Sequence, residues 1–294
     1  MMKFKQSILV IFIVFFFIVG LPIHADDSFR VETVPVNSWQ LSAAIGYGEI
    51  SSPIITDDDI HLLVLPDIRY YGDYLYIENT TVGWNLKETP RYAFGLVSML
   101  NMDGLYFSPK YRSLAAALSP PLTISAHPDP ETDVSDSDDE KKDSNAILVE
   151  QEQTKLTYNA GFAWRYYGPI ELRVALLKDV SVGHNGEELH ALAKTNYQWQ
   201  QLALEFEMGA TFKSSELVDY YYGIESTDTE QVGYAPKSSI NVHSQLQLAY
   251  PLSAQAWLVA AFRYEYLGAE IRHSPIVHDV AVRSYFLGVK WRFK

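Results

Sequence analysis

The chain contains no cysteine among its 294 residues, and its basic side chains are outnumbered, with 23 Lys and Arg against 36 Asp and Glu and a net charge of −13. Without cysteine there is no disulfide framework, no thiolate metal site and no cysteine nucleophile. Nucleic-acid-binding proteins normally carry a basic excess, so no nucleic acid is expected as a partner. Apolar and aromatic residues are abundant instead, including 20 tyrosines, and this content excludes a disordered chain.

Long apolar runs are also scarce. The longest spans residues 8–19 and lies in an N-terminal segment, residues 1–25, that we interpret as a secretory signal peptide. Two lysines precede the run, and the small-residue site Ile23-His24-Ala25 follows it, so cleavage is expected after Ala25. The alternative, a membrane anchor, needs about 20 apolar residues. The chain is therefore expected to be exported, with residues 26–37 forming a periplasmic N-terminal stretch.

Apolar residues in the remaining chain alternate with polar ones. In residues 201–212 the even positions are apolar and most odd positions are polar, and residues 240–250 and 155–166 repeat the pattern. A period of two places one apolar face on a strand, and segments of about 11 residues match tilted transmembrane strands. The pattern favours a membrane barrel over the alternative, a soluble β-sandwich, whose strands are usually about 5 or 6 residues long.

Aromatic residues gather near the ends of the predicted strands. They form the pairs Trp39 and Tyr47, Tyr70 and Tyr74, Trp164 and Tyr166, Tyr250 and Trp257, Tyr264 and Tyr266, and Trp291 and Phe293. Tyr and Trp are enriched at both membrane–water interfaces of transmembrane barrels. A closed barrel would also remove the open sheet edges that lipid cannot satisfy.

We predict one all-β domain over residues 38–294, a transmembrane antiparallel up-and-down β-barrel of about 12 strands, with ten as the alternative if residues 91–118 fold differently. The predicted strands are 38–48, 60–71, 74–86, 91–100, 105–118, 154–167, 170–182, 188–198, 201–212, 240–250, 255–267 and 280–293. Two are weak, because Glu78 falls on the lipid face of residues 74–86 and residues 105–118 alternate poorly.

The connections predict which end of the barrel faces outward. Long polar connections at residues 49–59, 119–152, 213–237 and 268–279 are expected on the cell surface, and short turns are expected in the periplasm. The connection near residues 119–152 contains an acidic run at 129–143 that predicts a disordered outer loop. Weak Ca²⁺ or Mg²⁺ binding is an alternative use of this run, but it lacks EF-hand spacing, and we predict no metal site and no cofactor.

Charged residues of both signs fall on the lumen-facing positions of the predicted strands. They include Asp67, Arg69, Lys155, Arg165, Glu171, Arg173, Lys194, Glu205, Glu207, His243, Arg263, Glu265, Lys290 and Arg292. A strongly selective pore tends to favour one sign, whereas mixed charges can pair across neighbouring strands and brace the wall. This polar wall predicts a narrow or largely occluded lumen.

Acidic and imidazole side chains in the outer loops are the candidates for catalysis. They are Asp57, Asp58, Asp59, His61, His184, His273, His278 and Asp279. Such groups facing one another across the rim could activate a water molecule. No fixed short spacing links them, so we interpret them as solvated loop residues and predict no catalytic site.

Several short motifs carry a resemblance to a known family. They are Trp39-Gln40-Leu41, Gly46-Tyr47-Gly48, Leu65-Pro66-Asp67-Ile68-Arg69-Tyr70, Asp219-Tyr220-Tyr221-Tyr222-Gly223-Ile224-Glu225, Tyr234-Ala235, Ser274-Pro275-Ile276-Val277 and Gly288-Val289-Lys290-Trp291-Arg292-Phe293. In order and spacing they resemble the MipA/OmpV family of outer-membrane proteins across most of the mature chain.

The resemblance implies a non-enzymatic barrel in the outer membrane of a Gram-negative bacterium, in contact with lipid and lipopolysaccharide. It further implies a scaffold that links a lytic transglycosylase to a peptidoglycan synthase during murein growth. The alternatives are a passive porin-like channel for small solutes and, third, a surface enzyme of the outer membrane.

Overall fold

The computed structural model describes residues 37–55, 58–107, 116, 156–224 and 233–293. The predicted signal peptide, residues 26–36 and the acidic loop near 119–152 lie outside the described residues. None of the helices in the described ranges is long and apolar enough to cross a membrane.

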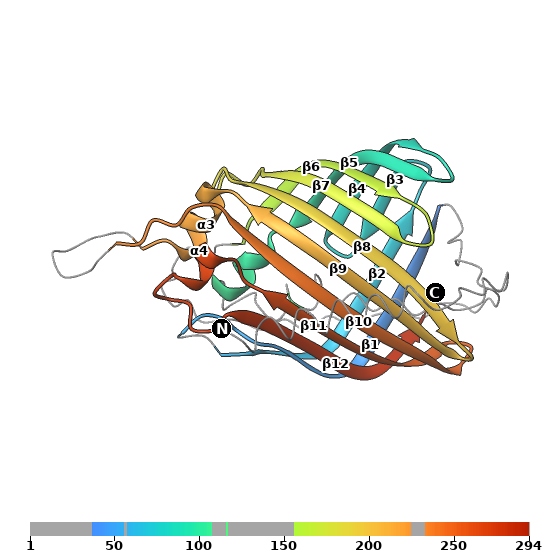
Figure 1. The fold of residues 1–294 in the computed structure, drawn as a ribbon. Helices are drawn as coiled ribbons and strands as arrows, with labels where there is room; N and C mark the ends of the chain where they lie inside the picture. The colour runs from blue at the N-terminus through green and yellow to red at the C-terminus, as the bar shows by residue number, and fades with distance from the viewer. Residues whose placement is uncertain (1–36, 56–57, 108–115, 117–155, 225–232, 294) are drawn as a thin grey trace, which may run out of the picture. The chain divides into compact units, whose positions relative to one another are not determined.

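The described residues form twelve antiparallel strands that close into one barrel (Figure 1). The strands are β1 (Ser38–Ile50), β2 (Ile60–Tyr71), β3 (Leu75–Glu78), β4 (Thr81–Glu88), β5 (Tyr92–Leu100), β6 (Tyr158–Tyr166), β7 (Glu171–Asp179), β8 (Glu187–Trp199), β9 (Leu202–Lys213), β10 (Ser239–Ser253), β11 (Ala256–Tyr266) and β12 (Ala281–Arg292). Each strand pairs with its sequence neighbours, and β1 pairs with β12 to complete the closure. The prediction of a twelve-stranded all-β barrel is confirmed.

Two of the predicted strands are wrong, and their errors cancel in the strand count. Residues 102–107, which overlap the predicted strand 105–118, form the 3₁₀ helix η1 (Met102–Phe107). The predicted strand 74–86 is two short strands, β3 and β4, joined at Asn79 and Thr80. Asn79 has a positive φ of 53°, and its side-chain Oδ1 accepts the backbone N–H of Ile68 at 2.8 Å. Asn tolerates this backbone conformation and forms a turn here, within residues whose alternation resembles one continuous strand.

The turn at Asn79 also corrects the placement of Glu78. In one continuous strand Glu78 would face lipid, as the sequence predicts. In the structure the chain reverses after Glu78, which shares a face with Tyr76, and the Tyr71 hydroxyl donates a hydrogen bond of 2.5 Å to the Glu78 carboxylate. Glu78 therefore lies on the inner face, where a charge has partners.

The two ends of the barrel differ. At one end the strands join through short turns, at residues 72–74, 89–91, 167–170, 200–201 and 254–255. At the other end the connections carry η1, α3 (Ser215–Tyr222) and α4 (Ala269–Arg272). Figure 1 shows α3 and α4 together at this loop end, and η1 at the same end.

The outer face is apolar. Alternate residues such as Ile45, Leu287 and Phe262 are exposed, as expected for side chains that meet lipid. Trp39 packs on Tyr70 near the short turns, with ring centroids 4.9 Å apart, and Tyr47 lies 6.3 Å from Tyr285 near the loop end. Aromatic pairs therefore mark both edges of the apolar band, as in the girdles of membrane barrels.

Candidate functional site

The lumen is the candidate site because charged side chains meet there from strands far apart in the sequence. Near the short turns, Lys290 of β12 contacts Asp67 of β2 at 2.6 Å, and Arg69 contacts the same carboxylate at 2.7 Å. β1 lies between β2 and β12, and its inward residue there is Ser42, which donates a 3.3 Å hydrogen bond to Asp67. The small serine leaves room for the lysine to reach across the strand.

A second ionic cluster spans β6 to β9. The Glu171 carboxylate contacts Arg173 at 2.5 Å, Arg165 at 3.7 Å and Lys194 at 4.0 Å. Lys194 also contacts Glu205 at 3.2 Å. One chain of alternating charges therefore crosses four neighbouring strands, and every carboxylate in it has a cation within reach.

A third cluster continues from β9 to β11. Glu207 contacts His243 at 3.2 Å and Arg263 at 3.8 Å, and Arg263 contacts Glu265 at 3.1 Å. Asn241 donates a 2.9 Å hydrogen bond to Glu265. Buried charges are tolerated when each has a partner and further hydrogen bonds, and this lining meets that requirement.

The polar wall predicted from the sequence is thus distributed over three ionic clusters. Lys155 lies outside the described residues. The guanidinium of Arg292 lies 5.9 Å from the ring of the buried Trp257. Glu78, which sequence reasoning missed, is close enough to Arg165, Arg173 and Arg69 to interact electrostatically.

At the loop end the lumen is filled by η1. Asp103 of η1 is 4% exposed, and Lys213 of β9 donates to both of its carboxylate oxygens, at 2.6 and 2.7 Å. The Tyr222 hydroxyl of α3 donates to the same carboxylate at 2.8 Å. Burial beside Asp103 raises the pKa of Tyr222 well above its usual value, so the hydroxyl remains a donor. We call Asp103, Lys213 and Tyr222 the η1 latch.

Sequence reasoning missed the η1 latch. Asp103-Gly104 has the composition of a turn, and it directly precedes the predicted strand 105–118. A signal was present, since Asp103 follows the end of β5 at Leu100 by three residues and is itself followed by Leu105-Tyr106-Phe107, which describes an apolar segment with one buried charge. The partner of that charge is 110 residues away, and no local pattern identifies it.

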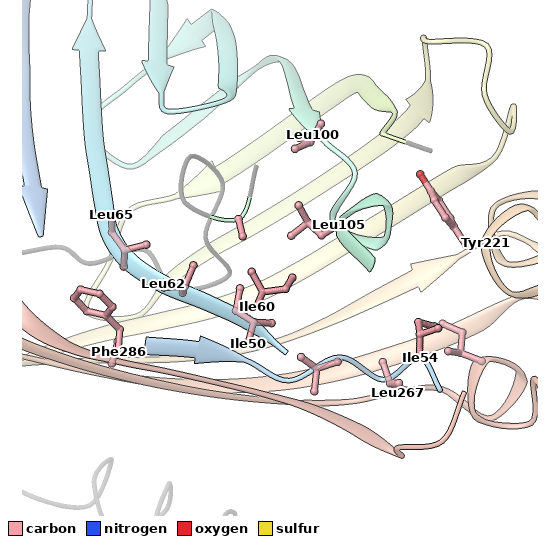
Figure 2. Close-up of a cluster of buried hydrophobic side chains, with 14 of the residues drawn as sticks. Ile50, Ile54, Ile60, Leu62, Leu65, Leu100, Leu105, Tyr221, Leu267 and Phe286 are labelled. Atoms are coloured by element: carbon pink, nitrogen blue, oxygen red, sulfur yellow. The ribbon is translucent and has the colours of Figure 1, made fainter. Parts of the chain in front are cut away.

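Apolar side chains fill the lumen around the η1 latch. Leu105 of η1 and Leu217 and Tyr221 of α3 are fully buried, in one cluster with residues of β1 and β2 (Figure 2). Phe107 lies 5.5 Å from the ring of Tyr221. We call η1, α3 and the side chains packed between them the outer plug. It leaves the loop end of the barrel packed with protein.

His184 lies in the β7–β8 connection, next to the outer plug. The backbone N–H of Gly186 donates to its Nδ1 at 2.9 Å, and its Nε2 lies 3.3 Å from the Thr157 hydroxyl. Burial lowers the pKa of His184, while the carboxylates of Asp179, Glu188 and Asp103 oppose that shift. Since Nδ1 accepts a backbone hydrogen bond, a proton there would break it. The imidazole is therefore held neutral.

The buried His184 predicts that acid weakens the barrel. Because its pKa is lower in the folded than in the unfolded chain, the unfolded chain binds more protons, and stability falls as the pH drops below about 6.5. Urea unfolding in detergent between pH 8 and pH 5 measures this loss, and H184Q should reduce it. An equal acid loss in H184Q and wild type would contradict the assignment.

The other candidates for catalysis do not converge. His61 contacts Glu49 at 3.5 Å, His278 contacts Asp279 at 3.8 Å, and Asp59 accepts the Ser52 N–H at 2.8 Å. The first and third contacts lie at the β1–β2 connection and the second at the β11–β12 connection, and the two connections meet through backbone hydrogen bonds such as that from the His278 N–H to the Pro53 carbonyl at 2.9 Å. His273 and Asp58 are exposed, and Asp57 lies outside the described residues. Within the described ranges, no three His, Asp or Glu side chains are grouped to hold a metal ion.

Comparison with known proteins adds a family match. Residues 41–293 match the family model described as "MltA-interacting protein MipA". The chain is 27% identical over 243 residues to a putative outer membrane protein, YiaT, of Escherichia coli K12, an alignment that covers 78% of this chain and 81% of YiaT.

Solved structures give weaker matches. OmpT, an outer membrane protein of Vibrio cholerae, matches with a TM-score of 0.34 and 10% identity, and the alignment covers 79% of this chain and 65% of OmpT, so the chain spans less than two thirds of its length. The outer membrane protein OprG from Pseudomonas aeruginosa matches with a TM-score of 0.23 and 8% identity, covering 88% of this chain and 97% of OprG.

Proposed function

Because this chain belongs to the family of the MltA-interacting protein MipA, we propose that it is a non-enzymatic scaffold that brings a lytic transglycosylase and a peptidoglycan synthase together at the outer membrane. The chain is an outer-membrane β-barrel protein of that family. The family name refers to an interaction with MltA, and this supports a murein hydrolase as the partner.

The observation that carries the proposal is the filled lumen. The outer plug packs the loop end with buried apolar side chains, and the η1 latch holds it by hydrogen bonds to a buried carboxylate. Below it, the three ionic clusters cross the wall with each carboxylate paired. Such an interior supports a role through the outer surfaces of the barrel more than a role as a wide channel.

A scaffold for murein enzymes would present its binding surface at the short-turn end, toward the periplasm. Gln200 is an exposed residue there, in the two-residue turn between β8 and β9, with a positive φ of 53°. Val182 is its counterpart at the loop end, 79% exposed in the β7–β8 connection, also with a positive φ. Both are turn residues on neighbouring connections at opposite ends of the barrel.

A photoreactive amino acid at Gln200 is expected to crosslink to murein enzymes in intact envelopes, whereas the same group at Val182 is not. The adducts should be identified by mass spectrometry as a lytic transglycosylase and a peptidoglycan synthase. The Val182 variant is the matched control for expression and nonspecific capture. Equal capture of these enzymes at both positions, or capture at neither, would contradict the scaffold.

A further inference from the structure

Charged side chains on the outward face near the loop end are mostly paired. Lys178 of β7 faces Glu187 of β8, and the two contact each other at 3.2 Å. Glu49 of β1 contacts His61 of β2 at 3.5 Å. Arg283 of β12 is different, because it is exposed and forms no salt bridge with a carboxylate that the structure describes. Its guanidinium therefore keeps its donors for a group outside the chain.

Arg283 stands where the apolar band of the outer wall ends. It lies two residues before Tyr285 on the same face of β12, and Tyr285 belongs to the aromatic pair near the loop end. Two residues beyond Tyr285, the lipid-facing Leu287 is 58% exposed. The backbone of Arg283 is fixed by Ser51, whose N–H donates to its carbonyl and whose hydroxyl accepts its N–H, each at 2.8 Å. The position of this cation at the edge of the band is thus set by the sheet.

A second arginine reaches the same part of the wall from α4. Tyr264 of β11 lies opposite Arg283, and Tyr266 is the next residue on the outward face of β11. The guanidinium of Arg272 lies 4.6 Å from the centre of the Tyr266 ring, a cation–π contact. Figure 1 shows α4 at the loop end, where β11 ends. We call Arg272, Arg283, Tyr264 and Tyr266 the arginine edge.

The acidic residue of α4 is engaged elsewhere. The Glu270 carboxylate accepts the backbone N–H of Lys237 at 3.1 Å, and the Glu270 carbonyl accepts the Tyr234 hydroxyl at 2.6 Å. Ile271 is fully buried and seats the helix on the barrel. Within the described ranges, Arg272 forms no salt bridge. Two cations therefore stand together without a carboxylate partner, in a chain whose net charge is −13.

We propose that the arginine edge binds lipopolysaccharide of the outer leaflet through its phosphate groups. Guanidinium groups match phosphate oxygens in a bidentate geometry, and basic residues at a membrane surface attract anionic headgroups. The acyl chains below such a headgroup would lie along Phe262 and Leu287, which are 49% and 58% exposed. The partner that fits both surfaces carries phosphate and acyl chains in one molecule.

The predicted orientation of the barrel puts the arginine edge in the outer leaflet, since the loop end is expected at the cell surface. Aromatic rings under and beside the two guanidinium groups hold them at the depth of the headgroups. The inference does not depend on the scaffold proposed above, because that proposal concerns the short-turn end.

Native mass spectrometry of the full chain in a neutral detergent tests the proposal, with diphosphoryl lipid A as the probe. Wild-type protein should retain this lipid, and it should retain dephosphorylated lipid A, which has the same acyl chains, at least about fivefold less. Inorganic phosphate at the same concentration should not displace the lipid. Equal retention of the two lipids would overturn the proposal, and so would displacement by inorganic phosphate, which would indicate a site for a free anion.

Single variants locate the binding. R272Q and R283Q should each reduce retention of diphosphoryl lipid A by about fivefold, the effect of one basic residue at a membrane surface. K178Q is the matched control, because Lys178 is also an outward cation near the loop end but is paired with Glu187, and it should retain the lipid as wild type does. An equal loss in K178Q and R283Q would show general charge attraction and overturn the assignment. The comparison of the two lipids on wild-type protein decides the question even if a variant fails to fold.

Discussion

Replacing Asp103 with alanine should lower the free energy of unfolding by about 3 to 5 kcal/mol, the cost of breaking a buried ion pair by removing one partner. Lys213 is 5% exposed, and its ammonium donates to both oxygens of the Asp103 carboxylate, at 2.6 and 2.7 Å. In D103A the ammonium would stay buried beside Tyr222 without its hydrogen-bonded carboxylate, and Glu188 and Glu265 would remain as the carboxylates that interact with it electrostatically. Urea unfolding of the barrel in detergent measures the loss.

The same substitution is expected to change conductance. η1 carries Leu105 and Phe107 of the outer plug, and Asp103 is its charged attachment to the wall. Wild-type protein in planar bilayers should therefore show no large, steady channel, whereas D103A should show open events. Large steady channels from wild-type protein would contradict the filled lumen and favour the passive-channel alternative. A silent D103A barrel that is still folded would show that the apolar contacts hold the outer plug alone.

Two further variants separate the buried charge from a general loss of charge. The double variant D103L/K213M removes both charges and should recover most of the stability lost in D103A, because neither charge is left unpaired. E187A removes a carboxylate from the exposed pair with Lys178, where the side chains are 59% and 55% accessible. Exposed pairs contribute little, so its loss should stay within about 1 kcal/mol.

The long strands of the barrel were predictable because their alternation is local. Residues 201–212 were predicted as a strand, and β9 runs from Leu202 to Lys213. Each such strand has to place apolar residues outward, and a slip of one residue would reverse every side chain. The pattern therefore identifies both the strand and its faces without reference to any other part of the chain.

The errors lie where local and tertiary signals differ. Apolar and polar residues alternate over residues 74–86 as in one continuous strand, although the chain direction reverses between β3 and β4. The sequence signal of this turn is Glu78, a charged residue at a position that would face lipid. The charge partners were also hidden, because Asp67 and Lys290 are 223 residues apart and meet across β1 only when the barrel closes. A sequence shows that charges of both signs line the wall, but the pairs follow from closure and register.

The closure of the barrel by β1 and β12 leads to the second large expected effect, a loss of stability in G46A. Gly46 pairs with Gly288 where β1 meets β12. A Cβ built on Gly46 would lie 2.1 Å from the carbonyl oxygen of Leu287 and 2.5 Å from the Cα of Gly288. Both are backbone atoms, so no side chain can rotate away, and β1 and β12 would have to separate. We expect a loss of about 3 kcal/mol, the upper part of the range for overpacking.

The measurement for G46A is the fraction of folded barrel after refolding in detergent, followed by its urea unfolding midpoint. G72A is the matched control, because the nearest atom to a Cβ on Gly72 is on the Tyr70 ring at 3.1 Å, and a side chain can give way. A G46A barrel as stable as G72A would mean that the β1–β12 pairing tolerates a wider spacing. A less stable G46A barrel would show that the close approach of Gly46 and Gly288 is needed for the pairing of β1 with β12. This pairing closes the barrel, and it joins the two strands that lie farthest apart in the sequence.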